Sequence, residues 1–251
     1  MLVLKIGGSA ITDKSRYMAA DAKRIDRIAK AIADAFLFKN MELVIVHGAG
    51  SFGHPQVIRH KIKEGVKGEK ARLGFAETHW CVSHLSQMIV EALIRHGVPA
   101  IIVPPVAVVR QSGKRISSLY DAPVKALLKQ GYIPVLHGDV VLDSKLGGSV
   151  CSGDQICAYL GKKADKAIFV TDVEGIFAEG KLVQLISKKN AKQVLKHVGS
   201  AKGSDVTGGM RGKLEEILKI RKPCFIVSAR HPERIKALLL GKKAIGTKIV
   251  P

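Results

Sequence analysis

Short apolar runs alternate with longer amphipathic stretches from one end of the chain to the other. Residues 2–6 and 43–46 form nearly continuous apolar runs of strand length, whereas residues 21–38 repeat apolar side chains at helical spacing. The same criteria predict the remaining elements. Further strands are expected at residues 100–103, 133–136, 167–171, 225–227 and 247–250, a turn-rich hairpin at 138–150, and further helices at 79–96, 123–130, 155–160, 190–198, 212–220 and 232–240.

Nearly continuous apolar strands that alternate with helices are typical of a parallel sheet covered on both faces. We therefore predict an α/β protein. No internal repeat and no Gly/Ser-rich linker interrupts the pattern. A single domain over residues 1–251 is expected, divided into two lobes at about residues 1–155 and 156–251.

The composition is that of an ordinary globular protein, with 251 residues, 47% hydrophobic and 25% charged. No apolar run approaches the ~18 residues that cross a membrane, and the N-terminal residues lack the features of a signal peptide. We therefore expect a cytoplasmic protein with no membrane partner. The cysteines show neither CxxC spacing nor a paired histidine pattern, which predicts reduced thiols and no metal site.

The formal net charge of +20 is high enough to suggest a nucleic-acid partner. The basic residues are scattered, however, and one tryptophan and four tyrosines offer few surfaces for base stacking. An anionic substrate together with a lysine-rich surface accounts for most of the charge. We therefore expect no nucleic-acid partner.

Two glycine-rich segments follow the first two predicted strands. One reads Lys5-Ile6-Gly7-Gly8-Ser9, and the other runs from His47 to His54 with glycines at 48, 50 and 53. Glycines let backbone N–H groups approach a phosphate, and ligands of open α/β sheets bind at the carboxyl ends of strands. The first segment fits a phosphate loop and a plain turn equally well. In the second, this context favours His54 as a donor to a phosphate oxygen over a purely structural histidine.

Residues 48–53 also match the dinucleotide-binding pattern G-x-G-x-x-G. That pattern normally follows the first strand of its unit, and here it follows the second. Pro55 limits how a helix could begin, and no acidic residue ends a clear strand about twenty residues later. A dinucleotide-dependent oxidoreductase is therefore a distant alternative to a loop that receives an isolated phosphate.

Three further polar segments stand at predicted strand ends or helix starts. In Ser152-Gly153-Asp154-Gln155, Asp154 either caps the next helix or holds two lysines between donor and acceptor phosphates. Residues 171–175 follow an apolar strand and form either a contact to a nucleotide's base or ribose or an ordinary turn. In residues 205–213 a glycine pair precedes a helix with Lys213 in its first turn, which favours an anion site.

The order of these five segments resembles the amino acid kinase family, which includes acetylglutamate, uridylate, carbamate and glutamate kinases. The resemblance extends from Lys5 to residues 246–247. It implies a three-layer αβα sandwich around a mostly parallel sheet, with the phosphoryl acceptor in the N-terminal lobe and the nucleotide in the C-terminal lobe. Residues 50–54 and 11–14 further resemble the branch of isopentenyl phosphate kinases and the related fosfomycin-type kinases.

The resemblance implies an ATP-dependent kinase whose acceptor is isopentenyl phosphate, with a fosfomycin-type or other small-acid kinase as the alternative. It also implies Mg²⁺ held mainly by the ATP phosphates, and a homodimer. His54 would bind the acceptor phosphate, and Asp154 would organise the lysines. Lys5 and Lys14 would neutralise the transferring group, and Lys213 the donor phosphates. The implied acceptor contacts are Gly8, Ala49, Gly50, His54 and Gly153, and the implied ATP contacts are Lys5, Gly7, Gly8, Ser9, Gly50, Thr171, Asp172, Gly175, Gly208, Gly209 and Lys213.

An ionised acceptor phosphate needs no general base, so positioning and charge neutralisation would supply most of the rate. An isoprenoid tail needs a dry pocket. Residues 73–76 and the helix at 80–93 are expected to line it, although most of that helix is expected to be ordinary core. The segment after Gly175 is shorter than is usual in the family, so the nucleotide base preference could differ.

Overall fold

The computed structural model describes residues 1–13, 15–198 and 209–251. Its main sheet has eight strands in the order β12-β14-β13-β9-β1-β2-β6-β3. All neighbouring strands in it are parallel except β13 and β14. The strands are β1 (Leu2–Ile6), β2 (Leu43–His47), β3 (Ala100–Ile102), β6 (Ile133–His137), β9 (Lys166–Thr171), β12 (Leu185–Ile186), β13 (Cys224–Ser228) and β14 (Thr247–Ile249).

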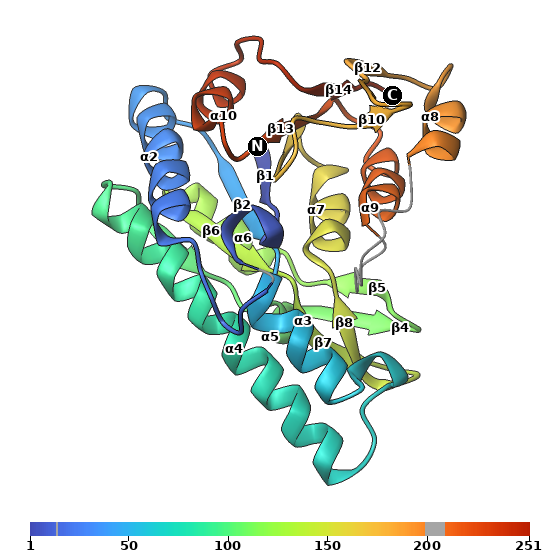
Figure 1. The fold of residues 1–251 in the computed structure, drawn as a ribbon. Helices are drawn as coiled ribbons and strands as arrows, with labels where there is room; N and C mark the ends of the chain where they lie inside the picture. The colour runs from blue at the N-terminus through green and yellow to red at the C-terminus, as the bar shows by residue number, and fades with distance from the viewer. Residues whose placement is uncertain (14, 199–208) are drawn as a thin grey trace.

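Helices cover both faces of this sheet, which gives three αβα layers (Figure 1). One face packs against α2 (Ala22–Phe38), α4 (Gly68–Arg95) and α10 (Pro232–Leu239), and the other against α6 (Ala122–Lys129), α7 (Gly153–Gly161), α8 (Ala191–His197) and α9 (Gly209–Leu218). Alternation along β1 assigns the faces: Leu4 and Ile6 join the core with α2 and α4, and Val3 joins the core with α7. Both the α/β class and the three-layer arrangement are thus confirmed.

A smaller sheet lies at one end of the main one, with the order β5-β4-β7-β8 (Figure 1). Its strands are β4 (Val109–Ser112), β5 (Arg115–Leu119), β7 (Asp139–Asp143) and β8 (Gly147–Cys151). The hairpin expected at residues 138–150 is β7–β8, which are antiparallel. β4 and β5 were not predicted. A further short hairpin, β10 (Phe177–Ala178) with β11 (Lys181–Leu182), occupies the shortened segment after Gly175.

Shorter helices follow three strands: α1 (Gly8–Ile11) follows β1, α3 (Gly50–Arg59) follows β2, and α5 (Pro105–Val108) follows β3. A 3₁₀ helix, η1 (Ile62–Glu64), follows α3. The expectation that Pro55 limits a helix after the second glycine loop is wrong, because α3 begins at Gly50 and contains Pro55. Proline cannot donate to the carbonyl four residues earlier, which is that of Ser51. The N–H of Met18 donates to this carbonyl instead, at 3.3 Å, so the helix can pass through the proline.

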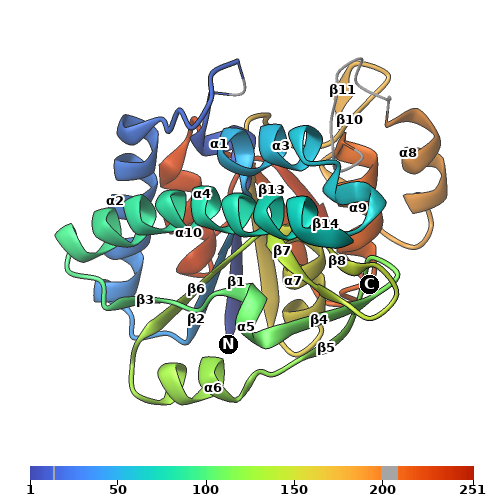
Figure 2. The same ribbon diagram turned by 90° about the horizontal axis from the view of Figure 1, so that it is seen from below.

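The helix predicted at 79–96 begins earlier, at Gly68, and ends at Arg95. Its first three turns are largely exposed, so they lack the apolar repeat by which a helix is identified from sequence. Figure 2 shows this helix crossing the molecule, and α3 packs against it. None of the helices in the described ranges is both long and apolar enough to span a bilayer.

Candidate active site

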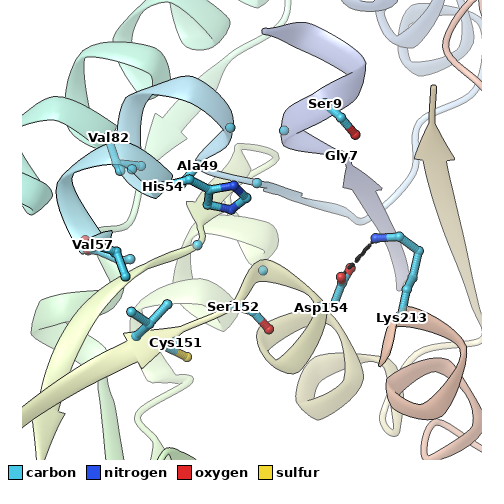
Figure 3. A pocket seen from close by; sticks show the side chains of 18 of the residues that line it. Gly7, Ser9, Ala49, His54, Val57, Val82, Cys151, Ser152, Asp154 and Lys213 are labelled. Carbon is cyan, nitrogen blue, oxygen red and sulfur yellow. Dashed lines mark hydrogen bonds and ion pairs between the residues drawn. The ribbon is translucent and has the colours of Figure 1, made fainter. Parts of the chain in front are cut away.

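A cavity of about 280 Å³ opens at the carboxyl ends of the central strands, between the glycine loops and α7. Figure 3 shows its labelled lining residues around an open centre. The main sheet positions one side of it, since Lys5 is on β1 and residues 7–9 and 48–50 follow β1 and β2. The β7–β8 hairpin and the start of α7 form the opposite side. This is the strand-end location that the sequence predicted.

Three charged side chains form the polar end of the cavity. The Asp154 carboxylate lies between Lys5 and Lys213: its Oδ1 is 2.9 Å from Nζ of Lys5, and its Oδ2 is 2.9 Å from Nζ of Lys213. The side chains of all three are at least 86% buried. The three groups together carry one net positive charge, in a place largely screened from water. Such a cluster can stabilise an anion strongly.

The fold brings the three residues in from three separate elements. Lys5 is on β1, on the same face as Val3, which packs against α7. Asp154 in the first turn of α7 and Lys213 on α9 point toward each other (Figure 3). The hydroxyl of Ser152 caps α7 by accepting from the Gln155 N–H at 3.2 Å. Asp154 is therefore not the cap, which leaves its carboxylate to the lysines.

Burial and charge act in opposite directions on this cluster. Burial lowers the pKa of Lys5 to about 8, although the charge of Asp154 works against that change. For Asp154 burial alone would raise the pKa, but the charges of Lys213 and Lys5 outweigh it and hold the pKa well below its ordinary value. The carboxylate is thus ionised at neutral pH, whereas Lys5 loses its proton unusually easily.

The two glycine loops touch each other at the cavity floor. A β-carbon added to Gly48 would lie 2.5 Å from the backbone nitrogen of Gly8. Gly50 has φ of +52°, and a β-carbon there would lie 2.8 Å from Cγ2 of Thr12. Only glycine fits these contacts, so the loops need glycine for their mutual packing as well as for any approach of a phosphate.

Thr12 and Ser51 connect the second glycine loop to the segment around residues 12–20. Oγ1 of Thr12 donates to the Gly8 carbonyl at 2.8 Å and accepts from the Ser51 N–H at 3.1 Å. The Ser51 hydroxyl accepts from the Ala19 N–H at 3.1 Å. These bonds hold three stretches of backbone in one fixed arrangement.

His54 projects from α3 into the middle of the cavity (Figure 3). The side beyond it is mainly apolar and includes Val57 on α3, Val82 on α4, the cross-strand pair Val140 and Val150, and Cys151. Burial raises the pKa of the Cys151 thiol above its ordinary value, so it remains a neutral thiol. The cavity therefore has a cationic end, an apolar end, and a histidine between them.

Asp139 also lines the cavity, and α4 supplies its partner. Nδ1 of His79 lies 2.9 Å from Oδ2 of Asp139, and the Val140 N–H donates to Oδ1 at 2.8 Å. The hydrogen bond to Asp139 raises the pKa of His79. The contact between His79 and Asp139 therefore holds the start of β7, which lines the cavity, against α4.

Most of the predicted site residues come together here. Thr171 and Gly175 lie outside the lining: the hydroxyl of Thr171 donates to the Val173 carbonyl, and Gly175 packs against Thr247. Lys14 and Gly208 lie outside the described residues. The predicted residues that line the cavity are Lys5, Gly7, Gly8, Ser9, Ala49, Gly50, His54, Gly153, Asp154, Asp172, Gly209 and Lys213.

The expected apolar lining is only partly correct. Val82 does line the cavity, but Leu73 and Trp80 face outward with exposed fractions of 61% and 56%. Residues 73–76 belong to α4 itself, where Phe75 packs against Gly148 behind the cavity wall. Val57, Val140, Val150 and Cys151 were not predicted, although the alternation within the predicted hairpin was a usable signal for the two valines of β7 and β8.

Comparisons with known proteins agree on one group. The model of the amino acid kinase family matches residues 1–228. The isopentenyl phosphate kinase of Methanothermobacter thermautotrophicus is 36% identical over 99% of this chain and 98% of its own length. The isopentenyl phosphate kinase of Methanocaldococcus jannaschii is 33% identical with the same coverage. An X-ray structure of isopentenyl phosphate kinase covers 100% of both chains, with a TM-score of 0.85 and 33% identity.

Proposed function

The chain belongs to the amino acid kinase family, and on that premise we propose that it transfers the γ-phosphoryl group of ATP to isopentenyl phosphate, forming isopentenyl diphosphate. It is a phosphotransferase with a phosphate group as acceptor. Isopentenyl phosphate kinases are similar to it over nearly its whole length, at 36% and 33% identity. The dinucleotide-dependent oxidoreductase considered from residues 48–53 is therefore set aside.

One observation carries the choice of acceptor: the cavity is cationic at one end and apolar at the other. A short prenyl phosphate has the same division, with an anionic head and a hydrocarbon tail. The tail would lie among Val57, Val82 and Val140, where burial of apolar surface is favourable. The phosphate would then lie beside His54 and the backbone of Ala49 and Gly50.

The donor phosphates would bind at the opposite, cationic end. Lys213 and Gly209 belong to α9, and Asp172 follows β9 on the same side of the cavity. Lys213 and Lys5 would neutralise the charge that develops on the transferring group. Asp154 would keep both ammonium groups at a fixed separation. Lys14 would add a third cation, as the family resemblance implies.

The chemistry needs little more than this arrangement. An acceptor phosphate oxygen is already ionised at neutral pH, so it can attack the γ-phosphorus directly once the two are aligned. We propose that Mg²⁺ arrives with ATP and is held mainly by its phosphates and by water. The protein residues fit that arrangement, because the Asp154 carboxylate is engaged by two lysines and the Asp139 carboxylate by His79.

The roles of the two lobes, the oligomeric state and the cellular location complete the proposed function. We propose that the lobe before about residue 155 binds the acceptor and the lobe after it the nucleotide, since His54 lies beside the apolar side of the cavity and Lys213 at its cationic end. A homodimer follows from the family resemblance, and sedimentation would test it. A cytoplasmic location agrees with the four cysteines, all of which are free and buried.

The decisive experiment is an ADP-release assay with a panel of acceptors. It compares isopentenyl phosphate with dimethylallyl phosphate, fosfomycin, acetylglutamate, carbamate and UMP at one fixed ATP concentration. We expect the highest kcat/KM for isopentenyl phosphate and the second highest for dimethylallyl phosphate. Preferred turnover of fosfomycin would establish the alternative branch instead, and preferred turnover of acetylglutamate, carbamate or UMP would remove the prenyl assignment.

A further inference from the structure

A pair of stacked histidines lies behind the cavity wall, on the α4 side of the sheet. β2 and β6 are neighbouring strands, and each ends at a histidine that is followed by a glycine. His47 and His137 are partners in the strand register. Their ring centroids are 5.4 Å apart, and both residues are fully buried. The glycines that follow them, Gly48 and Gly138, both line the cavity.

Each ring contacts the carbonyl group of the glycine that follows it. Nδ1 of His47 lies 3.0 Å from the Gly48 oxygen, and Nδ1 of His137 lies 3.3 Å from the Gly138 oxygen. A carbonyl oxygen can only accept, so Nδ1 carries the proton in both rings. Burial lowers the pKa of both histidines, that of His47 to about 3, so both rings are neutral and Nε2 is unprotonated.

The two Nε2 atoms have different surroundings. Nε2 of His47 accepts from the Ser86 hydroxyl on α4 at 2.7 Å. Nε2 of His137 is buried and has no hydrogen-bond partner within residues 1–13, 15–198 and 209–251. A buried acceptor without a partner is unfavourable and calls for an explanation. Because the surroundings of Nε2 differ, the contact that both histidines have in common is the hydrogen bond from Nδ1 to the glycine carbonyl.

That bond fixes the direction of the next backbone N–H. The peptide bonds here are trans, so a carbonyl and the following N–H point to opposite sides. With the Gly48 carbonyl turned toward the His47 ring, the Ala49 N–H points away from the ring, and Ala49 lines the cavity. A β-carbon added to Gly138 would lie 3.0 Å from the Gly153 nitrogen and 3.7 Å from the Ala49 nitrogen. Two backbone nitrogens thus lie close to Gly138.

We propose that His47 and His137 are positioning residues for the acceptor phosphate. Their Nδ1–H groups hold the Gly48 and Gly138 carbonyls away from the cavity, which leaves the Ala49 N–H directed at the phosphate oxygens. A carbonyl that turned into the cavity would repel the same oxygens. The identity of the acceptor in this inference rests on the proposed function, but the role of the two rings requires only an anion at this place.

Substitution by asparagine or by glutamine distinguishes the contribution of Nδ1 from that of Nε2. The side-chain amide of asparagine can occupy the position of Nδ1, and that of glutamine the position of Nε2. His47→Asn therefore keeps the donor to Gly48, whereas His47→Gln keeps the contact with Ser86 and loses that donor. Ser86→Ala is the matched control, because it removes the hydroxyl that pairs with Nε2 and leaves the Nδ1 donor in place. KM for isopentenyl phosphate, KM for ATP, kcat and the melting temperature are measured for each variant.

We expect His47→Gln to raise KM for isopentenyl phosphate at least tenfold while KM for ATP stays within twofold. His47→Asn and Ser86→Ala should keep the acceptor KM within threefold of the wild-type value. Equal effects of the asparagine and glutamine variants, or an effect of Ser86→Ala as large as that of His47→Gln, would overturn the proposal. If His47→Asn does not fold, His137→Asn and His137→Gln give the same comparison, with the same ranking expected.

An error in the proposed function can be distinguished from an error in this inference, because only the former would leave the wild-type protein without activity on isopentenyl phosphate. If wild-type protein does not phosphorylate isopentenyl phosphate, the affinity of the same variants for inorganic phosphate is measured by calorimetry with the donor site filled by AMP-PNP. The glutamine variant should again bind at least tenfold more weakly than the asparagine variant. Equal affinities, or no phosphate binding by the wild type, would reject the positioning role.

Discussion

Gly8 and Gly50 meet backbone to backbone, and a β-carbon on Gly8 would lie 2.7 Å from Cα of Gly50. Real β-carbons do not come this close to backbone atoms, so a side chain at Gly8 would push the two loops apart. The loops follow adjacent parallel strands, β1 and β2, and both line the cavity. Their contact therefore sets the distance between the backbone groups proposed for the donor and for the acceptor.

Gly8→Ala should abolish most of the activity. A displacement of about 1 Å between reacting groups can reduce the rate roughly 100-fold, and we expect kcat/KM for both substrates to fall by about that factor. Gly180→Ala is the control, since Gly180 has φ of +76° but open space around its β-carbon position. It should lower stability by about 1–2 kcal/mol and leave kcat unchanged. A fully active Gly8→Ala enzyme would contradict the loop-contact argument.

Lys213→Ala should mainly weaken the use of ATP. Loss of one charge-assisted contact costs roughly 1.5–3 kcal/mol, a decrease in kcat/KM for ATP of about 10- to 150-fold. Folding should survive, because Asp154 keeps its partner Lys5. Arg211→Ala removes a positive charge from the same helix at an exposed ion pair with Glu215, and should have little effect. Equal losses in the two variants would indicate a general effect of charge.

The lowered pKa of Lys5 predicts a basic limb in the pH profile. Below pH 8 the ammonium is charged, and kcat/KM for ATP should fall as pH rises through about 8. Lys5→Arg should remove that limb if the longer side chain is accommodated, since arginine keeps its proton. A profile that stays flat to pH 10 in the wild type would argue against a role for the Lys5 charge.

Loss of the Lys5 proton should raise the stability of the fold, although it lowers the activity. Between pH 8 and the ordinary lysine value of 10.5, the unfolded chain holds a proton that folded Lys5 has lost. The free energy of unfolding therefore gains from this group as pH rises through that window. Urea unfolding at several pH values, compared between wild type and Lys5→Met, isolates the contribution. Identical pH slopes in the two proteins would contradict it.

His54→Ala should weaken the binding of isopentenyl phosphate and leave the binding of ATP nearly unchanged. We expect KM for isopentenyl phosphate to rise at least about tenfold, as for the loss of one hydrogen bond to a charged group, and KM for ATP to stay within about twofold. His84→Ala is the matched histidine control, because that ring is half-buried, meets Trp80 edge to face and lies outside the cavity lining. Unchanged acceptor kinetics in His54→Ala would remove His54 from the acceptor site.

The strand-ending motifs were predictable because each combines a local signal with a fixed place in the fold. A parallel sheet places the carboxyl ends of its strands together, so Lys5, the loop before His54 and the turn at Asp172 had to converge. The Asp154 cluster was predictable only as one of two alternatives. The structure decides between them because Ser152 takes the capping position.

The small second sheet was not predictable in the same way. Its strands β4 and β5 are short and largely polar, and a single carboxylate holds their turn. Asp143 accepts from the N–H groups of Gly113 and Lys114 at 3.0 and 2.7 Å, about thirty residues away in sequence. Contacts over such separations leave no periodic trace in the sequence. The rest of the apolar end of the cavity was missed for the same reason, since Val57, Val140 and Val150 meet only after this sheet has formed.

The continuity of the cavity from His54 to Lys213 has a stereochemical consequence. When both ligands occupy one continuous space, the acceptor oxygen can approach the γ-phosphorus opposite the bond that breaks. A single displacement of this kind inverts the three remaining oxygens around phosphorus. A γ-phosphoryl group made chiral with oxygen isotopes would therefore reach the product with reversed handedness, whereas a relay through a phosphorylated His54 would restore the original one.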